Sequence, residues 1–279
     1  MYMSGLLFRQ INSHVVNAVP LQDVDLRPVK GKDICAEAFA NIFLVAKKRS
    51  GKTSVIFKLL KECSGKNTRI IVFCSTVYKD KNWIGIRSYF EKKGMDIECF
   101  TDIYDNGVNN IEAIIEELGT DTAEHEEEVP TDPADRLLML LGNKSPKKEK
   151  KQKKSQCLAP DCVMVFDDSR HQLRDPILQS LLKKNRHYRL KCIISSQWLN
   201  DMRPEQRKQI DLWMIFRGMP FKKLEEIAKD ADVSMDVKQF WKIYRKATKK
   251  QYSFLYIDTS DGHMRQNFNN LIEFKESEE

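Results

Sequence analysis

The sequence has no long apolar run and no recognisable leader. A helix that crosses a bilayer needs about 18 consecutive apolar residues, and no such run occurs. The N-terminal sequence MYMSGLLFRQINSH has too short an apolar stretch for a secretory signal, and no small-residue cleavage site follows it. We therefore expect an intracellular protein with no membrane span.

Closely spaced cysteine pairs are also missing. The seven cysteines are scattered along the chain, and none forms a C-x-x-C pair. Cys157 and Cys162 are the nearest two, and no cluster of histidines or cysteines completes a tetrahedral zinc site around them. Cys74 and Cys192 lie in apolar runs typical of strands. The pattern predicts reduced thiols in a protein core, not a disulfide framework.

Charge is unevenly distributed over the 279 residues. The formal net charge is +7, and the segment 144–154 (KSPKKEKKQKK) contributes +6 of it through seven lysines and one glutamate. A short acidic run, Glu124 to Glu128, precedes that segment. The remainder is nearly neutral, which argues against a uniformly basic DNA-binding surface. The blocks predict a solvated connector, and contact with nucleic acid remains the alternative, because lysines bind phosphates without needing a fold.

What the chain does contain is a series of apolar runs of strand length that alternate with amphipathic stretches. The expected strands are 42–45, 70–74, 96–100, 163–166, 190–194, 212–216 and 252–257, and the expected helices are 54–62, 83–93, 111–118, 176–184, 221–230 and 235–247. Continuous apolar strands indicate a sheet that is covered on both faces. The sequence therefore predicts an α/β fold with a mainly parallel sheet and helices on both sides, in which ligands bind at the carboxyl ends of strands.

A phosphate-binding loop follows the first of these strands. Residues 46–53 (AKKRSGKT) match G-x-x-x-x-G-K-[ST] at every fixed position except the first, where Ala46 replaces glycine. Backbone N–H groups at the start of the next helix would surround the phosphates, Lys52 would reach the β- and γ-phosphates, and the Thr53 hydroxyl would bind Mg²⁺. A basic loop with a chance GKT is the alternative. The predicted nucleotide-binding residues are Ala46, Lys47, Lys48, Arg49, Ser50, Gly51, Lys52, Thr53 and Ser54.

Two carboxylates follow a second apolar strand. Asp167 and Asp168 come directly after Val163–Phe166. Asp167 is predicted to orient Mg²⁺ through its water shell beside Thr53, and Asp168 to polarise the attacking water. Most hydrolytic proteins with this loop carry glutamate in the second position, and aspartate is one methylene shorter. A turn or a helix cap is the structural alternative for two acids at the end of a strand.

Polar residues on either side of the run 190–194 are further catalytic candidates. Gln197 follows the run and could sense the γ-phosphate or hold the lytic water, unless it is only a satisfied loop amide. Arg186 and Arg189 precede it. An arginine at a subunit edge could neutralise transition-state charge in a neighbour's site, an effect worth roughly 10³–10⁵ in rate. Arg186 is the first choice, although arginines at helix ends also commonly cap carbonyl groups.

Three segments together resemble a known family. KKRSGKTS, CVMVFDDS and KNRHYRLKCIISSQ, in this order, are similar to segments of the genome-packaging ATPases of large eukaryotic DNA viruses, virophages and Polinton-type elements, which belong to the HerA–FtsK group of DNA translocases. The resemblance covers residues 41–270 without 119–159. Its more specific parts are the double aspartate and the Arg-His that precedes the Ser-Gln strand. Ala46 and the long charged insert depart from the family pattern, but neither removes a catalytic group.

The resemblance implies a RecA-like P-loop core that assembles into a ring of five or six subunits. Such a ring would use ATP and Mg²⁺ to drive double-stranded DNA into a preformed capsid. The implied partners are double-stranded DNA, further copies of the chain, and capsid or portal-vertex proteins. The implied location is the host cytoplasm or nucleus where virions assemble, or the virion itself. DNA-contacting residues are open. Lys222, Lys223, Lys249 and Lys250 are exposed-looking candidates, but a solvated face is the preferred interpretation of these lysines.

The predicted organisation is one discontinuous domain with extensions. Residues 1–40 form an N-terminal extension, 41–118 and 160–270 the ATPase domain, 119–159 a charged and disordered insertion, and 271–279 an acidic tail. Two other functions stay open. One is a phosphoryl-transfer enzyme similar to a nucleoside kinase, which the paired acids, Gln197 and the lack of a compact arginine-rich lid disfavour. The other is a non-catalytic, nucleotide-gated interaction module, which requires that Asp168 be an ineffective base.

Overall fold

The computed structural model describes residues 25–125, 156–170 and 172–273. Nine strands in these ranges form one sheet in the order β11-β10-β9-β8-β1-β7-β6-β2-β3, and β4 and β5 form a separate hairpin. The strands are β1 Asn41–Val45, β2 Arg69–Phe73, β3 Ile97–Phe100, β4 Tyr104–Asp105, β5 Val108–Asn109, β6 Cys162–Asp167, β7 Leu190–Ser196, β8 Leu212–Phe216, β9 Phe254–Asp258, β10 Met264–Gln266 and β11 Asn270–Leu271.

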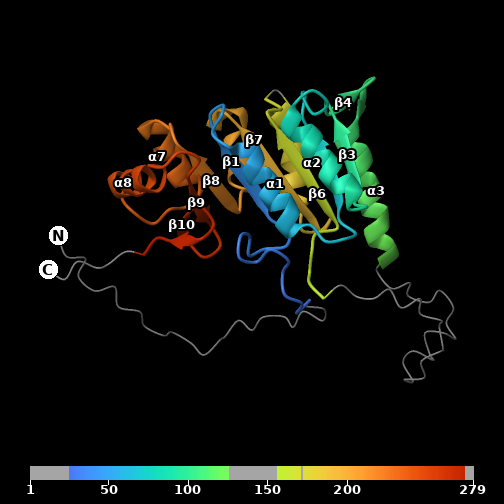
Figure 1. Ribbon diagram of the computed structural model, residues 1–279, viewed down its shortest axis with the longest axis horizontal. Helices are drawn as coiled ribbons and strands as arrows, with labels where there is room; N and C mark the ends of the chain where they lie inside the picture. The colour runs from blue at the N-terminus through green and yellow to red at the C-terminus, as the bar shows by residue number, and fades with distance from the viewer. Residues whose placement is uncertain (1–24, 126–155, 171, 274–279) are drawn as a thin grey trace, which may run out of the picture.

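Helices cover both faces of this sheet. In Figure 1, α1 and α2 lie in front of the strands, α7 and α8 lie at the left end, and α3 lies at the right end. The α-helices are α1 Lys52–Cys63, α2 Lys81–Lys92, α3 Asn110–His125, α5 Pro176–Lys184, α6 Pro204–Arg207, α7 Phe221–Asp230 and α8 Val237–Ala247, and the 3-10 turns are η1 Gln172–Arg174 and η2 Leu199–Asp201.

The central strands run parallel, as the sequence predicts. The pairs β8–β1, β1–β7, β7–β6, β6–β2 and β2–β3 are all parallel. Antiparallel pairing begins only beyond β8, where β9 and β10 continue the sheet and β11 closes its edge. The predicted α/β fold with a mainly parallel sheet is confirmed.

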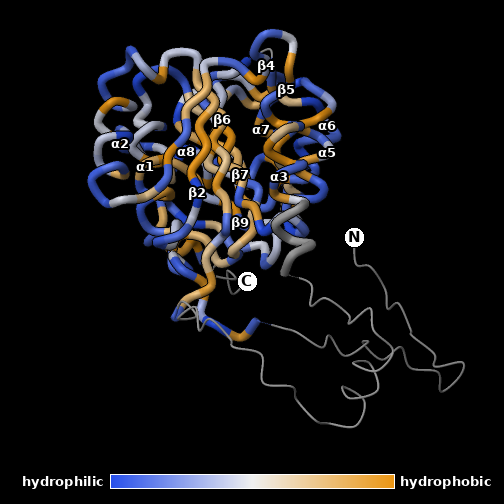
Figure 2. The backbone as a smooth tube through the Cα atoms, turned by 90° about the vertical axis from the view of Figure 1, so that its right-hand side faces the viewer, coloured by the Kyte–Doolittle hydropathy of each residue, from blue (hydrophilic) through white to orange (hydrophobic). Residues whose placement is uncertain are grey.

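Two apolar cores result from the alternation of side chains along each strand. Phe43 and Val45 of β1 point into the core beneath α3, α5, α7 and α8, whereas Ile42 and Leu44 point into the core beneath α1 and α2. Figure 2 shows mostly apolar strands between helices in which hydrophilic and apolar residues alternate. Burial on both faces explains why these strands read as unbroken apolar runs.

Aspartates set the start of three helices. Asp80, Asp175 and Asp236 each accept a hydrogen bond from a backbone N–H in the first turn of α2, α5 and α8, respectively. The predicted end of a helix at Gly119 is wrong, because α3 continues through this residue to His125. A glycine inside a helix costs only about 1 kcal/mol relative to alanine, so strong helix formers around it can carry the helix past it.

Other predictions from the sequence have mixed outcomes. All seven cysteines are free thiols in this structure, and their reduced state in solution stays a prediction. Within the described ranges, no helix is long and apolar enough to cross a membrane. The lysine-rich segment 144–154, most of the acidic run, and residues 274–279 of the tail lie outside the described residues. The division into extension, domain, insertion and tail stays a prediction.

Candidate nucleotide-binding site

Strand order brings three predicted segments to one edge of the sheet. β7 lies between β1 and β6, so its end separates the phosphate loop after β1 from the two acids at the end of β6. Val45 pairs with Ser196, and Asp167 pairs with Ser195. The three strands therefore end at the same level, with their carboxyl ends side by side.

Two residues of the phosphate loop have a left-handed backbone conformation. Arg49 has φ 61° and Gly51 has φ 91°, and Gly51 is the N-cap of α1. Ala46 is buried, its N–H donates to the Ser196 carbonyl at 2.9 Å, and it is not among the described residues with positive φ. Glycine is therefore not required at the first position of this loop, which explains why alanine is tolerated there.

The neighbouring β8–α7 and α8–β9 turns pack against the loop. A Cβ atom on Gly218, which has φ 99°, would lie 3.0 Å from Cε of Lys47, and a Cβ atom on Gly51 would lie 3.2 Å from a ring carbon of Tyr252. Tyr252 is itself 61% exposed and has φ 63°. The sequence pattern does not point to Tyr252, because an expected strand at 252–257 would place it within the sheet.

Lys52 contacts both of the predicted acids. Its Nζ atom lies 3.3 Å from Oδ1 of Asp167 and forms a second, closer ion pair with Asp168. The Lys52 side chain is only 12% exposed, and that of Asp167 only 6%. The lysine of the loop and the twin acids, which are more than 110 positions apart in the chain, thus form one ionic cluster, as their motifs predict.

Two uncharged donors fix Asp167. The Trp83 indole N–H, from α2, donates to Oδ2 at 2.9 Å, and the Ser195 hydroxyl, from β7, donates to Oδ1 at 2.7 Å. Each carboxylate oxygen therefore accepts one hydrogen bond, which orients the group. Neither donor was predicted from the sequence. Trp83 reads as an apolar helix residue, although the need of a buried indole N–H for an acceptor was a usable signal.

Asp168 and Gln197 meet beside this cluster. Asp168 has φ 53°, a conformation that aspartate adopts more readily than most residues, and its N–H donates to the Ser195 carbonyl at 3.2 Å. Its side chain is 40% exposed. The Gln197 amide nitrogen lies 3.4 Å from each Asp168 carboxylate oxygen. The two predicted catalytic groups that would handle water are therefore in contact, and both face solvent.

A buried carboxylate is hydrogen-bonded to the last residue of β7. Asp201 accepts hydrogen bonds from the Ser196 hydroxyl and from Nε of Arg170, which lies 3.2 Å away. The Arg170 guanidinium also lies 5.8 Å from the ring centroid of Trp198, a side chain that is 58% exposed. This network links the segment after the twin acids to the segment that carries Gln197.

The predicted trans-acting arginines lie at the opposite, amino edge of the sheet. Arg186 pairs with Glu37 at 2.9 Å and with Asp211 at 3.4 Å, and its side chain is 63% exposed. Arg189 pairs with Asp161 at 2.6 Å. The structure does not bring either arginine to the nucleotide site of its own chain. Action on a neighbouring subunit stays a prediction.

The lysines proposed for DNA contact differ in their surroundings. Lys223 is engaged within the chain, by Asn200 at 3.0 Å and by Glu226 at 2.6 Å. Lys222, Lys249 and Lys250 are exposed. Contact of these lysines with DNA stays untested.

The residues present fit a nucleotide with bound Mg²⁺. The Ser50 hydroxyl oxygen is shielded from solvent and has no hydrogen-bond partner among the described residues, so a buried polar atom in the loop still needs one. Thr53 and Asp167 supply a hydroxyl and an oriented carboxylate. No cluster of three or more His, Cys, Asp or Glu side chains suited to a metal occurs in the described ranges. Mg²⁺ in phosphate-binding sites needs none, since it takes one or two protein ligands plus phosphate oxygens and water.

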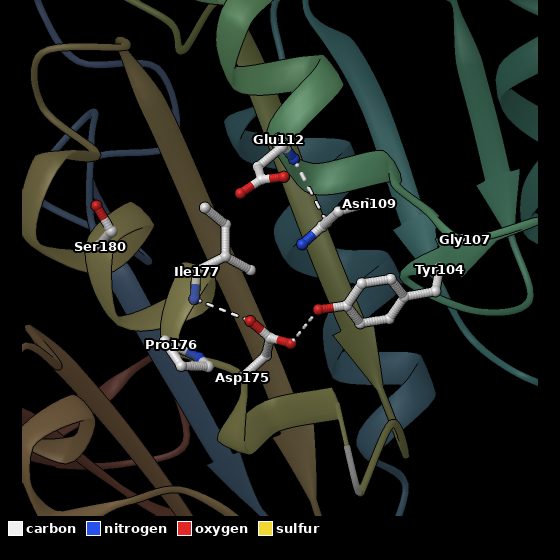
Figure 3. A pocket seen from close by; sticks show the side chains of 8 residues that line it. All are labelled: Tyr104, Gly107, Asn109, Glu112, Asp175, Pro176, Ile177 and Ser180. Atoms are coloured by element: carbon white, nitrogen blue, oxygen red, sulfur yellow. Dashed lines mark hydrogen bonds between the residues drawn. The ribbon is translucent and has the colours of Figure 1, made fainter.

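Two shallow hollows lie away from this cluster. One, of about 480 Å³, is lined by residues of the β4–β5 hairpin and the starts of α3 and α5, among them Tyr104, Asn109 and Asp175. Figure 3 shows the Tyr104 hydroxyl pointing at Asp175, to which it donates at 2.7 Å. Asp175 also caps α5, so its carboxylate is already satisfied. The other, of about 460 Å³, is lined by Arg174, Arg207 and neighbouring residues. Neither includes a residue of the phosphate loop.

Comparison with known proteins reveals similarity at the level of structure. No protein-family model matches the chain, and no curated protein matches it significantly. The genome packaging NTPase B204 of Sulfolobus turreted icosahedral virus 2, in complex with AMP, is similar over 83% of this chain and 98% of its own, with 18% identity and a TM-score of 0.46. B204 of Sulfolobus turreted icosahedral virus, a DNA-packaging ATPase, is similar over 82% of this chain and 96% of its own, with 18% identity and a TM-score of 0.47.

A bacterial protein aligns with a higher TM-score. The cytoplasmic domain of the Thermomonospora curvata type VII secretion ATPase EccC is similar over 86% of this chain and 26% of its own, with 9% identity and a TM-score of 0.51. The fold is that of a RecA-like P-loop NTPase. At such identities the similarity concerns the fold alone. The assignment of individual residues in this P-loop NTPase fold therefore depends on the geometry described above.

Proposed function

We propose that this chain is an ATP-hydrolysing motor that moves double-stranded DNA into a preformed capsid. The observation that carries the ATPase part is the ionic cluster of Lys52, Asp167 and Asp168, in which the Lys52 ammonium lies 3.3 Å from the Asp167 carboxylate. A phosphate loop alone binds many ligands. A loop lysine next to an oriented carboxylate and a second, solvent-facing one is the arrangement that hydrolysis of a triphosphate needs.

Phosphate binding and water activation are assigned to different groups of the chain. Backbone N–H groups from Lys47 to Ser54 bind the phosphates at the start of α1. The Lys52 ammonium exchanges Asp168 for the β- and γ-phosphates, because a triphosphate carries more negative charge than one carboxylate. Asp168 is then released to accept a proton from water, which Gln197 holds beside it.

The metal site uses the oriented acid. Thr53 and Asp167 would hold Mg²⁺, which neutralises charge on the β- and γ-phosphates when bound. The two donors to Asp167 hold its carboxylate in one orientation and leave its remaining lone pairs available.

The motor part of the proposal is supported by the resemblance of three sequence segments to the packaging ATPases. We propose a ring of five or six copies, in which Arg186, or Arg189 as second choice, acts on the neighbouring subunit's nucleotide. The partners are double-stranded DNA and capsid or portal-vertex proteins. In this proposal, DNA translocation takes place where virions assemble in the host cell.

A phosphate-release assay with and without duplex DNA tests the proposal. We expect Mg²⁺-dependent ATP hydrolysis that duplex DNA stimulates and that Lys52→Ala abolishes. Lys58→Ala is the matched control, since this lysine lies on the same helix and pairs with Glu62 in an exposed i,i+4 bridge. Unchanged hydrolysis in Lys52→Ala would refute the ATPase assignment. Transfer of phosphate to a small acceptor would indicate a kinase, and binding without turnover would indicate a nucleotide-gated module.

A further inference from the structure

A buried lysine at the amino edge of the sheet contacts a cysteine sulfur, and no described carboxylate lies within ion-pair distance of it. Lys191 is the second residue of β7 and is only 1% exposed. Its Nζ atom lies 2.8 Å from the Cys35 sulfur and 2.7 Å from the Glu37 carbonyl oxygen, and no ion pair with a carboxylate is present among the described residues. The Glu37 and Asp211 carboxylates interact with this ammonium group at longer range. A negative group in direct contact would offset more of the cost of burying its charge.

A thiolate at Cys35 would supply such a charge. Cys35 is fully buried, and a side-chain hydrogen bond with Cys63 together with the Lys191 ammonium lowers its pKa to about 6, although burial opposes the shift. The same hydrogen bond, with burial, raises the pKa of Cys63. The two sulfurs are therefore hydrogen-bonded beside an ammonium group, with the lower pKa at Cys35. A cation next to a thiol of lowered pKa favours its nucleophilic form, and the second thiol lies where it could resolve an oxidised Cys35.

Backbone packing brings the two sulfurs together. Cys63 ends α1, and Cys35 ends a turn in which its N–H donates to the Gly31 carbonyl at 2.9 Å. A Cβ atom on Gly31 would lie 2.9 Å from the Cys63 sulfur, so only glycine allows the turn to approach the helix this closely. Figure 1 shows the segment that carries this turn, in blue, below the C-terminal end of α1.

We propose that Cys35 and Cys63 are a redox-active pair that a hydroperoxide converts to a disulfide, with Cys35 as the attacking thiolate and Lys191 as the group that keeps it ionised. The bond would tie the segment 29–35 to the helix whose other end carries the phosphate loop.

The two steps balance with hydrogen peroxide as the oxidant. The Cys35 thiolate attacks one peroxide oxygen, the O–O bond breaks, and the products are Cys35 sulfenic acid and hydroxide, which takes a proton from solvent. The Cys63 sulfur then attacks the Cys35 sulfur, an S–S bond forms, and the S–O bond breaks. The departing oxygen leaves as water with the Cys63 proton. Two electrons pass from the sulfur pair to the peroxide, and two water molecules form.

Peptide mapping of the full chain tests the assignment. Reduced protein is treated with hydrogen peroxide for increasing times, free thiols are blocked under denaturing conditions, and cross-linked peptides are identified by mass spectrometry. We expect Cys35–Cys63 to be the first disulfide, and Cys192 to stay reduced over the same time. Cys192 is the internal control, because it is also fully buried but its pKa is raised by burial.

Variants separate the roles of the three groups. In Cys63→Ser, Cys35 should stop at the sulfenic acid and be trapped by dimedone. Lys191→Met should slow the oxidation of Cys35 at least about 10-fold, as expected when the thiolate fraction falls. The exposed Lys183→Met is its control. The oxidised wild type should also melt on the order of 5–10 °C higher, and dithiothreitol should reverse the shift, since the bond closes a long loop of the unfolded chain.

Three results would overturn the proposal. One is a first disulfide between any other two cysteines. Another is oxidation of Cys35 no faster than that of Cys192, which would mean that Cys35 is a neutral thiol donating to the Glu37 carbonyl at 3.1 Å. The third is an unchanged rate in folded Lys191→Met. If that variant does not fold, the comparison of Cys35 with Cys192 in the wild type still decides.

Discussion

Replacement of Trp83 by phenylalanine isolates the hydrogen bond that orients Asp167. Trp83 is 1% exposed, and its indole N–H donates to Asp167 Oδ2 at 2.9 Å. A hydrogen bond to a charged group contributes about 1.5–3 kcal/mol to stability. The substitution also removes ring volume from the core and leaves a cavity, so its total effect on the free energy of unfolding contains two contributions.

Trp213 provides the matched control for the loss of volume. It is fully buried, and its indole nitrogen has no hydrogen-bond partner among the described residues. Trp213→Phe therefore removes a similar volume and no hydrogen bond. We expect Trp83→Phe to lower the free energy of unfolding by about 1.5–3 kcal/mol more than Trp213→Phe does. With a urea m-value of about 3 kcal/mol/M, the difference between their midpoints would be about 0.5–1 M.

The same pair of variants tests the role of Asp167 in the site. Loss of a group that orients a metal ligand typically weakens metal affinity or activity by about 10–100-fold. Trp83→Phe should therefore raise the Mg²⁺ concentration for half-maximal ATP hydrolysis by about 10-fold, and Trp213→Phe should leave it unchanged. Equal losses of stability in both variants, or an unchanged Mg²⁺ requirement in Trp83→Phe, would show that this bond does not orient the carboxylate.

Three further substitutions test other parts of the site. Asp168→Asn should still bind ATP but hydrolyse it about 10²–10⁴-fold more slowly in single-turnover assays, and normal turnover would assign the base to another residue. Ala46→Gly should keep the ATPase rate and change the stability to urea by less than about 1 kcal/mol, because the alanine has no positive φ; a large gain in rate would contradict this. Arg186→Ala subunits mixed into wild-type assemblies should lower the ATPase rate more than in proportion to their fraction, whereas a linear loss would exclude action on a neighbour.

The sequence could predict the site where it depends on short motifs. The phosphate loop, the twin acids and Gln197 each follow an apolar strand, and the carboxyl ends of neighbouring parallel strands meet at one edge. The alternation of apolar runs also indicated the parallel sheet. Antiparallel β10 and β11 were not predicted, because strands of three and two residues carry too little pattern.

Contacts between distant segments were not predictable in this way. The Trp83 donor is 84 positions from Asp167, and its distance from the acid depends on how α2 packs on the sheet. Lys191 interrupts an apolar strand in which every residue is buried, so the sequence itself indicates a lysine that needs a buried partner. The identity of that partner was not predictable, because Cys35 lies 156 positions away. Contact of the lysine with the sulfur requires the segment before β1 to fold back beneath α1.

The location of Arg186 constrains how a ring could form. Its ion pairs with Glu37 and Asp211 lie at the amino edge, whereas the nucleotide site lies at the carboxyl edge. For Arg186 to act on a neighbour, the amino edge of one subunit must therefore face the carboxyl edge of the next, which is a head-to-tail contact that can close into a ring. Exposed ion pairs contribute only about 0–1 kcal/mol, so a triphosphate on the neighbouring subunit would compete easily for this 63% exposed arginine. Its pairing within the chain is thus compatible with a role in trans.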